Sequence, residues 1–162
     1  MKLASVCVLV PLVWILASCA GTAPAAETAG REIVKFSEIK GKMWQLSAVK
    51  TGPQTIDLDR QVLTAQGMGD IYTLTFNEDI LTGKAAPNLY YGPYKAGTGN
   101  VLSIGNMAGT LMAAIWELDG LKEQEFFDYL SRVTSWTAAA GRLELHTSNA
   151  AGETAILVFT AL

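Results

Sequence analysis

Apolar side chains recur at every second position along most of this chain. The alternation is clearest in Lys42–Lys50, where Trp44, Leu46 and Ala48 share one face. A period of two places successive side chains on opposite faces of a β-strand, with one face buried. Shorter runs of the same kind predict further strands at residues 71–76, 80–85, 101–104, 111–116, 142–147 and 154–159. Turn residues separate run 71–76 from run 80–85, and run 142–147 from run 154–159. Each of these two pairs is therefore expected to form an antiparallel hairpin.

One stretch departs from this period. In Leu121–Val133 the apolar residues Phe126 and Leu130 have helical spacing, and Asp119 stands where a side chain can accept the free N–H groups of a first helical turn. A shorter helical turn is expected at Ser37–Lys40. About seven short strands with one covering helix predict an α+β fold that is mainly antiparallel β, either a curled sheet or a cracked barrel.

The first 18 residues resemble an export signal. Lys2 precedes an apolar run over residues 3–17, which fits the core of a signal peptide and is too short to cross a bilayer as a helix. The run ends in Leu16-Ala17-Ser18-Cys19, which resembles the lipobox of bacterial lipoproteins, where the cysteine is lipidated after cleavage of the preceding bond. The alternative is an ordinary secretory signal followed by an incidental cysteine.

Cleavage after Ser18 would make Cys19 the lipidated N-terminus and hold the mature protein on a membrane that it does not cross. Residues 19–32 are small and of low complexity, which is typical of a flexible tether, so the folded domain is expected at residues 33–162. We expect the cell envelope, and within it the outer membrane facing the periplasm, because Ala20 replaces the aspartate that retains many lipoproteins at the inner membrane.

Charge and composition exclude several classes of protein. The chain has 12 Lys and Arg, 15 Asp and Glu, one His and two Cys, without a basic cluster, so no nucleic-acid partner is expected. Cys7 lies in the leader and the sulfur of Cys19 would carry lipid, which leaves no thiol for a metal or a nucleophile. His146 alternates outward, and Asp57 and Asp59 lack the glycine and the distal glutamate of a calcium loop. We therefore predict no metal, no cofactor and no enzymatic activity.

The segment Asn88-Leu89-Tyr90-Tyr91-Gly92-Pro93-Tyr94 resembles the N-x-[YF]-x-G-x-Y element of the META domain, the family that includes the HslJ-like heat-inducible lipoproteins. The similarity extends from about Lys42 to Phe159. Two cysteines that are usual in the family are replaced by Pro87 and Ala114, so no role that depends on those thiols carries over. Further positions that match the family pattern in order are Trp44, Gly83, Thr110 and Glu125.

The resemblance implies a cracked barrel with a helix, similar in shape to the pilot lipoproteins of bacterial secretins. It also implies links to heat response, novobiocin tolerance and virulence, but no reaction. We expect the motif residues to be structural: Gly92-Pro93 forming a turn, Asn88 holding a turn with its side chain, and Tyr90 and Tyr94 packing on the barrel with their hydroxyls in water. An aromatic recognition surface is the alternative.

Several large apolar residues admit two interpretations. Either they fill the core, or they line an apolar pocket in a cracked barrel that takes a lipid or a small apolar ligand; they are Trp44, Met107, Met112, Trp116 and Trp136. The function predicted from the sequence is that of a non-enzymatic envelope lipoprotein that supports stress or drug tolerance by binding a lipid, a small molecule or another envelope component. The alternative is a pilot-like or chaperone-like module that binds a protein of a secretion or outer-membrane complex.

Overall fold

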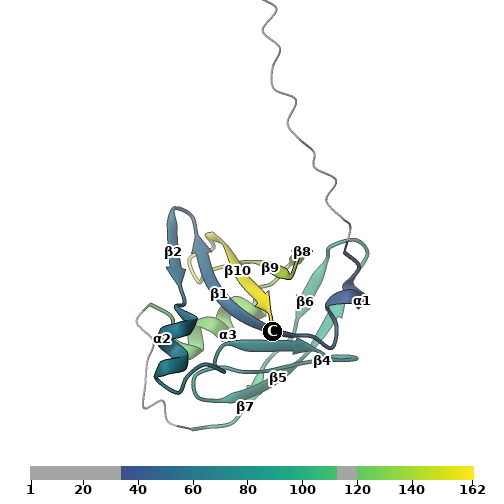
Figure 1. Ribbon diagram of the computed structural model, residues 1–162. Coiled ribbons are helices and arrows are strands. Elements are labelled where there is room, and N and C mark those ends of the chain that lie inside the picture. Colours follow the sequence, from purple (N-terminus) through teal and green to yellow (C-terminus); the bar gives the residue numbers. More distant parts are fainter. Residues whose placement is uncertain (1–33, 113–119) are drawn as a thin grey trace, which may run out of the picture. The chain divides into compact units, whose positions relative to one another are not determined.

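The alternating segments form one antiparallel sheet in the computed structural model, which describes residues 34–112 and 120–162 (Figure 1). Its main path runs β6-β5-β4-β3-β1-β10-β9-β8, while β2 pairs with β1 and β7 pairs with β5. The strands are β1 (Met43–Thr51), β2 (Gln54–Asp57), β3 (Thr73–Phe76), β4 (Ile80–Lys84), β5 (Leu89–Ala96), β6 (Leu102–Ile104), β7 (Ala108–Gly109), β8 (Ser135–Ala139), β9 (Arg142–Ser148) and β10 (Thr154–Ala161).

Strand β1 occupies the middle of the sheet. One edge pairs with β10, with Trp44 opposite Ala161, and the other edge pairs first with β3 and then with β2. The register with β10 shifts between Leu46 and Ala48, which marks a bulge in β1. The two predicted hairpins, β3–β4 and β9–β10, are confirmed.

The two ends of the strand path meet, so that the sheet forms a nearly closed barrel. The amide of Leu102 donates to the carbonyl of Thr134 at 3.1 Å, and the amide of Trp136 donates to the carbonyl of Asn100 at 3.0 Å. The side-chain amide of Asn100 also donates to the carbonyl of Trp136 at 2.7 Å. These bonds join β6 to β8 and confirm the predicted barrel-like antiparallel sheet, because they pair edges that would otherwise be free.

Three helices accompany the sheet within the described ranges: α1 (Phe36–Ile39), α2 (Arg60–Ala65) and α3 (Glu123–Ser131). The first and third confirm the two predicted helical segments. The N-cap of α3 is Lys122, without a side-chain cap, and Asp119 lies outside the described residues. Helix α2 was not predicted; the carboxylate of Asp59 caps it by accepting from the amides of Gln61 and Val62 at 3.0 Å. No helix in the described part of the chain is both long and apolar enough for a membrane span.

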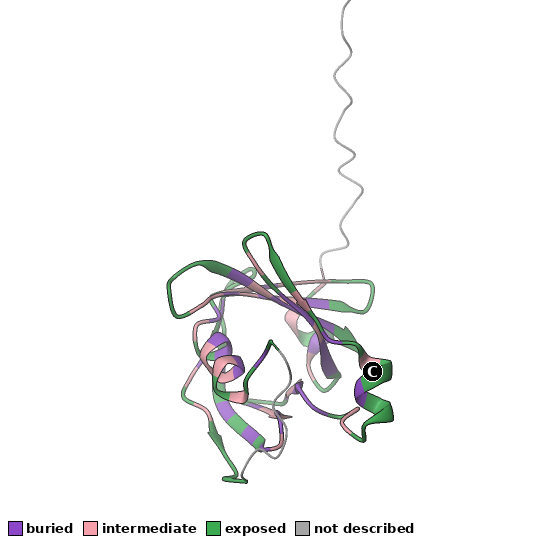
Figure 2. Ribbon diagram, turned by 90° about the vertical axis from the view of Figure 1, so that its left-hand side faces the viewer, coloured by how far each residue is buried: buried purple, intermediate pink, exposed green. Residues whose placement is uncertain are grey.

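Aromatic rings fill both ends of the barrel interior. At the α1 end, Phe36 contacts Phe76, Tyr94 and Trp136 with ring centroids 5.2–5.6 Å apart. At the α3 end, Phe126 packs against Tyr72 at 5.1 Å and Tyr90 at 5.9 Å. Buried and exposed residues alternate along the strands around these clusters (Figure 2). On β5 and β9 the alternation predicted from the sequence separates a packed interior from an outer sheet face. On β1 the prediction that Ala48 shares a face with Trp44 and Leu46 is wrong, because the bulge after Leu46 turns Val49 into the core in its place.

One predicted strand, residues 111–116, is wrong in its described part. Leu111 and Met112 belong to no strand, and residues 113–116 lie outside the described residues. The local strand is β7, which ends at Gly109; the amide of Thr110 still donates to the carbonyl of Leu89 in β5, and the amide of Met112 then donates to Oδ1 of Asn88. The alternation also left β2, β5 and β8 unpredicted.

Candidate functional site: an outer cleft on the sheet

The tyrosine-rich motif forms β5, and the turn predicted at Gly92-Pro93 does not occur. The strand continues through both residues, with Pro93 opposite Ile80 in β4. On its other edge, β5 pairs with β7 at Tyr90 and Tyr91 and with β6 from Tyr94 onward. Pro93 lies between these two pairings, where no neighbouring strand requires an N–H donor, so proline is tolerated inside the strand.

Tyr90 and Tyr94 point into the barrel, and their hydroxyls are bonded to the protein instead of lying in water. The hydroxyl of Tyr90 donates to the carbonyl of Thr73 at 2.7 Å. That of Tyr94 donates to the carbonyls of Asn77 and Glu78 at 2.5 and 2.9 Å. Burial raises the pKa of both phenols, so they stay protonated as donors. The expectation of hydrated hydroxyls is wrong, because these bonds tie β5 to β3 and the turn after it.

Glycine at position 83 is required by the ring of Tyr90 on the adjacent strand. A Cβ atom at Gly83 would lie 2.0 Å from the carbonyl oxygen of Thr73 and 2.5 Å from the hydroxyl of Tyr90. At Gly92 a Cβ atom would lie 2.6 Å from the sulfur of Met107. Gly83 therefore makes room for the backbone of β3 and the ring of Tyr90, and Gly92 makes room for the side chain of Met107.

Asn88 holds the segment after β7 against the start of β5; its predicted role in holding a turn is wrong, because β5 runs straight through Gly92 and Pro93. Its Oδ1 accepts from the hydroxyl of Thr110 at 2.7 Å and from the amide of Met112 at 2.8 Å. Its Nδ2 donates to the carbonyl of Met112 at 3.2 Å and to the carboxylate of Glu123 at 2.8 Å. The family glutamate was assigned to Glu125, whose carboxylate accepts from Tyr129 instead. Glu123 was missed, since both glutamates begin the same helix and the sequence does not distinguish them.

A cleft of about 800 Å³ lies on the outer face of the sheet, over β1, β3, β4, β5 and β7. The ladder aligns one outward row across it, in the order Met43, Thr75, Thr82, Tyr91 and Ala108. The largest exposed side chains of its wall are apolar or aromatic: Met43 (51% exposed), Ile80 (47%), Leu89 (58%) and Tyr91 (57%). Of the predicted motif residues, Gly83, Tyr90 and Thr110 also contribute to the wall.

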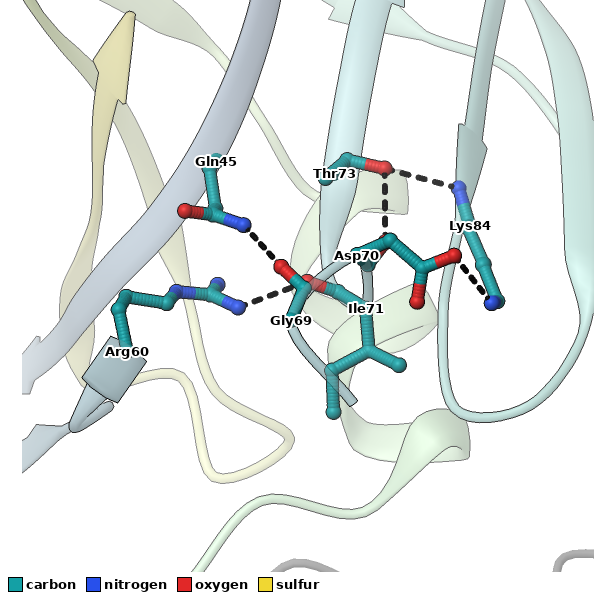
Figure 3. A network of polar contacts seen from close by, with 7 residues as sticks. All are labelled: Gln45, Arg60, Gly69, Asp70, Ile71, Thr73 and Lys84. Carbon is teal, nitrogen blue, oxygen red and sulfur yellow. Dashed lines mark hydrogen bonds and ion pairs between the residues drawn. The ribbon is translucent and has the colours of Figure 1, made fainter. Parts of the chain in front are cut away.

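A loop between α2 and β3 forms one rim of the cleft, and Figure 3 shows the contacts that fix it. From β1, the side-chain amide of Gln45 donates to the carbonyl of Gly69 at 2.5 Å. The carboxylate of Asp70 pairs with the ammonium of Lys84 at 2.5 Å, and the hydroxyl of Thr73 accepts from the backbone amide of Lys84. Asp70 and Lys84 are the only charged residues of the described cleft wall. Because they neutralise each other, the cleft carries no net charge.

Arg60 fastens the same loop from the other side. Its guanidinium donates to the carbonyl of Ile71 at 2.9 Å and, through Nε at 2.8 Å and through Nη2, to the carbonyl of Leu46 beside the bulge in β1. Desolvation by burial lowers the pKa of this guanidinium to about 10, with a smaller opposing effect of Tyr72. Three donors on one planar group thus hold β1 and the rim together.

The apolar pocket predicted from the sequence does not form: its described residues do not line one common cavity. The indole N–H of Trp44 donates to the carbonyl of Ile39, and Trp136 packs against Phe36. Met107 lies near Gly92, and the exposed side chain of Met112 follows β7. None of these four lines the outer cleft. The fifth member, Trp116, lies outside the described residues.

A second cleft, of about 430 Å³, lies between β1, β2, α3 and the turn joining β9 to β10. Its polar wall includes Glu125, Asp128 and Glu153, and Tyr129 lies beside them with a phenol whose pKa is raised by burial. No group of three or more His, Cys, Asp or Glu within the described ranges is arranged to hold a metal ion. His146 is half-buried on β9, where its ring lies 3.4 Å from the hydroxyl of Thr137.

The fold and the outer cleft define a small barrel-like antiparallel domain with an apolar surface on its sheet. The chain belongs to the META domain family, whose model matches residues 37–160. The NMR structure of a protein from Burkholderia xenovorans is similar, with 22% identity over 78% of this chain and 85% of that one and a TM-score of 0.56. The crystal structure of a DUF4847 family protein from Bacteroides vulgatus is also similar, with 12% identity over 76% of this chain and 94% of that one and a TM-score of 0.50. These likenesses show the fold. No curated protein matches the chain.

Proposed function

We propose that this protein is a non-enzymatic, lipid-anchored protein of the cell envelope, whose META domain binds an apolar envelope component at the outer cleft and thereby supports stress or drug tolerance. The observation that carries the binding role is the neutral cleft with its exposed apolar wall of Met43, Ile80, Leu89 and Tyr91. Exposed apolar surface that is gathered in one place is typical of an interaction site. The packed aromatic interior favours this outer surface over an internal site.

The anchor rests on the sequence Leu16-Ala17-Ser18-Cys19, which lies outside the described residues. Lipidation of Cys19 would keep the domain at a membrane surface, where its partner would be another envelope molecule. The non-enzymatic role is supported by residue types: the chain has a single histidine, and lipidation would leave no thiol after loss of the leader. The outer membrane is proposed as the location because Ala20 follows the lipidated position.

Site-specific photo-crosslinking in intact cells tests the binding role. A benzophenone amino acid replaces Tyr91 in the outer cleft or, for comparison, Ala150 in the exposed turn between β9 and β10, which borders the second cleft. We expect the probe at position 91 to capture an envelope lipid or a small apolar molecule that the probe at position 150 does not capture. Equal capture at both positions would refute binding at the cleft. The mass of the N-terminal peptide, compared with that of Cys19→Ala, tests the anchor separately.

A protein-binding module is the second candidate, and one observation favours it. Strand β7 is two residues long and pairs with β5 alone among the described strands, and the fully exposed side chain of Leu111 follows it. An unpaired strand edge with apolar neighbours is a common site for addition of a partner's strand. Stoichiometric capture of one protein by the probe at position 91 would favour this function over lipid binding.

A further inference from the structure

We infer that the outer cleft docks on the bilayer that holds the lipidated N-terminus, so that the domain lies with the β4–β5 face on the membrane. This inference rests on the proposed lipid anchor and names the occupant of the cleft. Three observations carry it: where the chain enters the domain, how far the tether reaches, and what chemistry the cleft wall presents.

The described chain reaches the cleft one short helix after its start at Val34. The first helix, α1, leads directly into β1, whose first residue, Met43, is part of the cleft wall. The segment between them is fixed to the β3–β4 hairpin: the amide of Gly41 donates to the carbonyl of Phe76 at 2.8 Å, and the ammonium of Lys40 donates to the carbonyl of Glu78 at 3.2 Å. The same hairpin continues into Ile80, another wall residue. The end of α1 is therefore fixed near the apolar face, while Phe36 at its start packs into the barrel against Phe76 and Trp136.

The tether would keep this face close to the lipid. A flexible chain of the length from Cys19 to Val34 has an r.m.s. span of roughly 20 Å. Such a short link gives the attached surface an effective concentration in the millimolar range, so a weak preference for lipid is sufficient to populate the docked state.

The chemistry of the wall suits the interface between lipid headgroups and acyl chains. Leu89 and Ile80 provide aliphatic surface, and Tyr91 provides an amphipathic ring of the kind that is enriched at membrane interfaces. Leu111 extends the apolar surface, since the adjacent Thr110 is bonded to Leu89: the hydroxyl of Thr110 accepts from the amide of Leu89 at 3.2 Å. Since the two charges of the wall are paired with each other, docking requires no anionic lipid.

This orientation gives the molecule a membrane side and an aqueous side. Figure 1 shows β2 and the turn between β9 and β10 on the side of the domain away from β4, β5 and β7. The second cleft, which these elements border, would therefore face the aqueous compartment. Ala150 lies in that turn and serves as the control position in the experiment below.

Spin labelling of the mature lipidated protein in vesicles tests the inference. Leu89→Cys and Tyr91→Cys carry nitroxides in the cleft, and Ala150→Cys carries the control, with labelling specific because the sulfur of Cys19 is acylated. The vesicles contain phosphatidylethanolamine with or without phosphatidylglycerol. We expect the ratio of oxygen accessibility to accessibility for a polar nickel complex to rise several-fold at positions 89 and 91 on binding to vesicles, to stay unchanged at 150, and to be the same in both lipid mixtures.

Each outcome decides between separate claims. Water-like accessibility at 89 and 91 on protein whose mass shows a lipidated Cys19 would overturn the docking and leave the anchor intact. A mass without lipid would refute the anchor, and immersion of the labels in that protein would still support the membrane-facing cleft. Immersion that requires phosphatidylglycerol would overturn the neutral docking argued above. Unfolding temperatures equal to that of the wild type establish that the labelled variants are folded.

Discussion

Replacing the side chain of Asn88 is the strongest single test of the role that its hydrogen bonds play in stability. Asn88→Ala removes four hydrogen bonds, of which three join neutral groups and one reaches the carboxylate of Glu123. At about 1 kcal/mol for each neutral bond and about 2 kcal/mol for the charged one, the gross loss is about 5 kcal/mol. Because Thr110 and Met112 lie at the surface, hydrogen bonds to water replace part of those lost. We therefore expect the free energy of unfolding to fall by about 2–3 kcal/mol.

Urea unfolding followed by circular dichroism measures this loss, and a thermal scan should show the unfolding temperature lower by roughly 6–12 °C. Hydrogen exchange adds a local measurement, since the amide of Met112 donates to Oδ1 of Asn88 and should exchange faster in the variant. Asn106→Ala, at an exposed loop position, is the matched control and should stay within about 0.5 kcal/mol of the wild type. A loss below about 0.5 kcal/mol for Asn88→Ala, or an equal loss for the control, would refute the reasoning.

The substitution Asn88→Asp gives the same site a pH dependence of known sign. A carboxylate here lies next to Glu123, so repulsion and burial should raise the pKa of the new side chain above the ordinary value of about 3.9. Protonation then restores a donor toward Glu123. The stability deficit relative to the wild type should be complete at pH 7 and shrink as the pH falls toward 5. A deficit that grows over that range would contradict the geometry.

Three further substitutions test other contacts, all by urea unfolding. Gly83→Ala should cost about 3 kcal/mol because its Cβ would meet a carbonyl and the ring of Tyr90; Gly99→Ala, with a positive φ and open space, should cost only about 1 kcal/mol. Tyr90→Phe should lower stability by about 1–2 kcal/mol at pH 7. Since the pKa of this phenol is raised in the folded state, wild-type stability should fall as the pH rises above about 10, and less steeply in Tyr90→Phe. Arg60→Lys should cost about 2 kcal/mol, because an ammonium cannot reproduce the planar set of donors, and a neutral result would contradict that role.

Hydrophobic periodicity predicted the long strands β1, β9 and β10, and the reason is visible in the burial pattern of β9, where every second residue from Leu143 onward is buried. It did not predict β5, where the local turn preference of Gly92-Pro93 pointed to a loop. Periodicity could not find β2, because its exposed sequence Gln54–Asp57 has no buried face to repeat. Helix α2 was not predicted for a similar reason, since Leu63 is its only buried residue. Short elements that are fixed by tertiary hydrogen bonds leave little trace in a local pattern.

The candidate site was only partly predictable. The motif containing Tyr90 was found in the sequence, but the outer row formed by Met43 and Tyr91 depends on the register of strands that are distant in the chain. The turn at Gly92-Pro93 was inferred from local preference, which the pairing of β5 overrides. The role of Glu123 depends on how α3 is rotated against β5, and one sequence does not specify that rotation.

The position of β1 between β3 and β10 has a consequence for the order of events during synthesis. The first long strand of the domain pairs along its whole length with the last one, so Trp44 has no partner on that edge until residues as late as Ala161 are available. Closing so long a loop costs conformational entropy, which makes the pairing of β1 with β10 a late step in folding. A nascent chain of this sequence therefore stays incomplete until its final strand is released. Translocation machinery that accepts only unfolded polypeptides would find it still competent for transport.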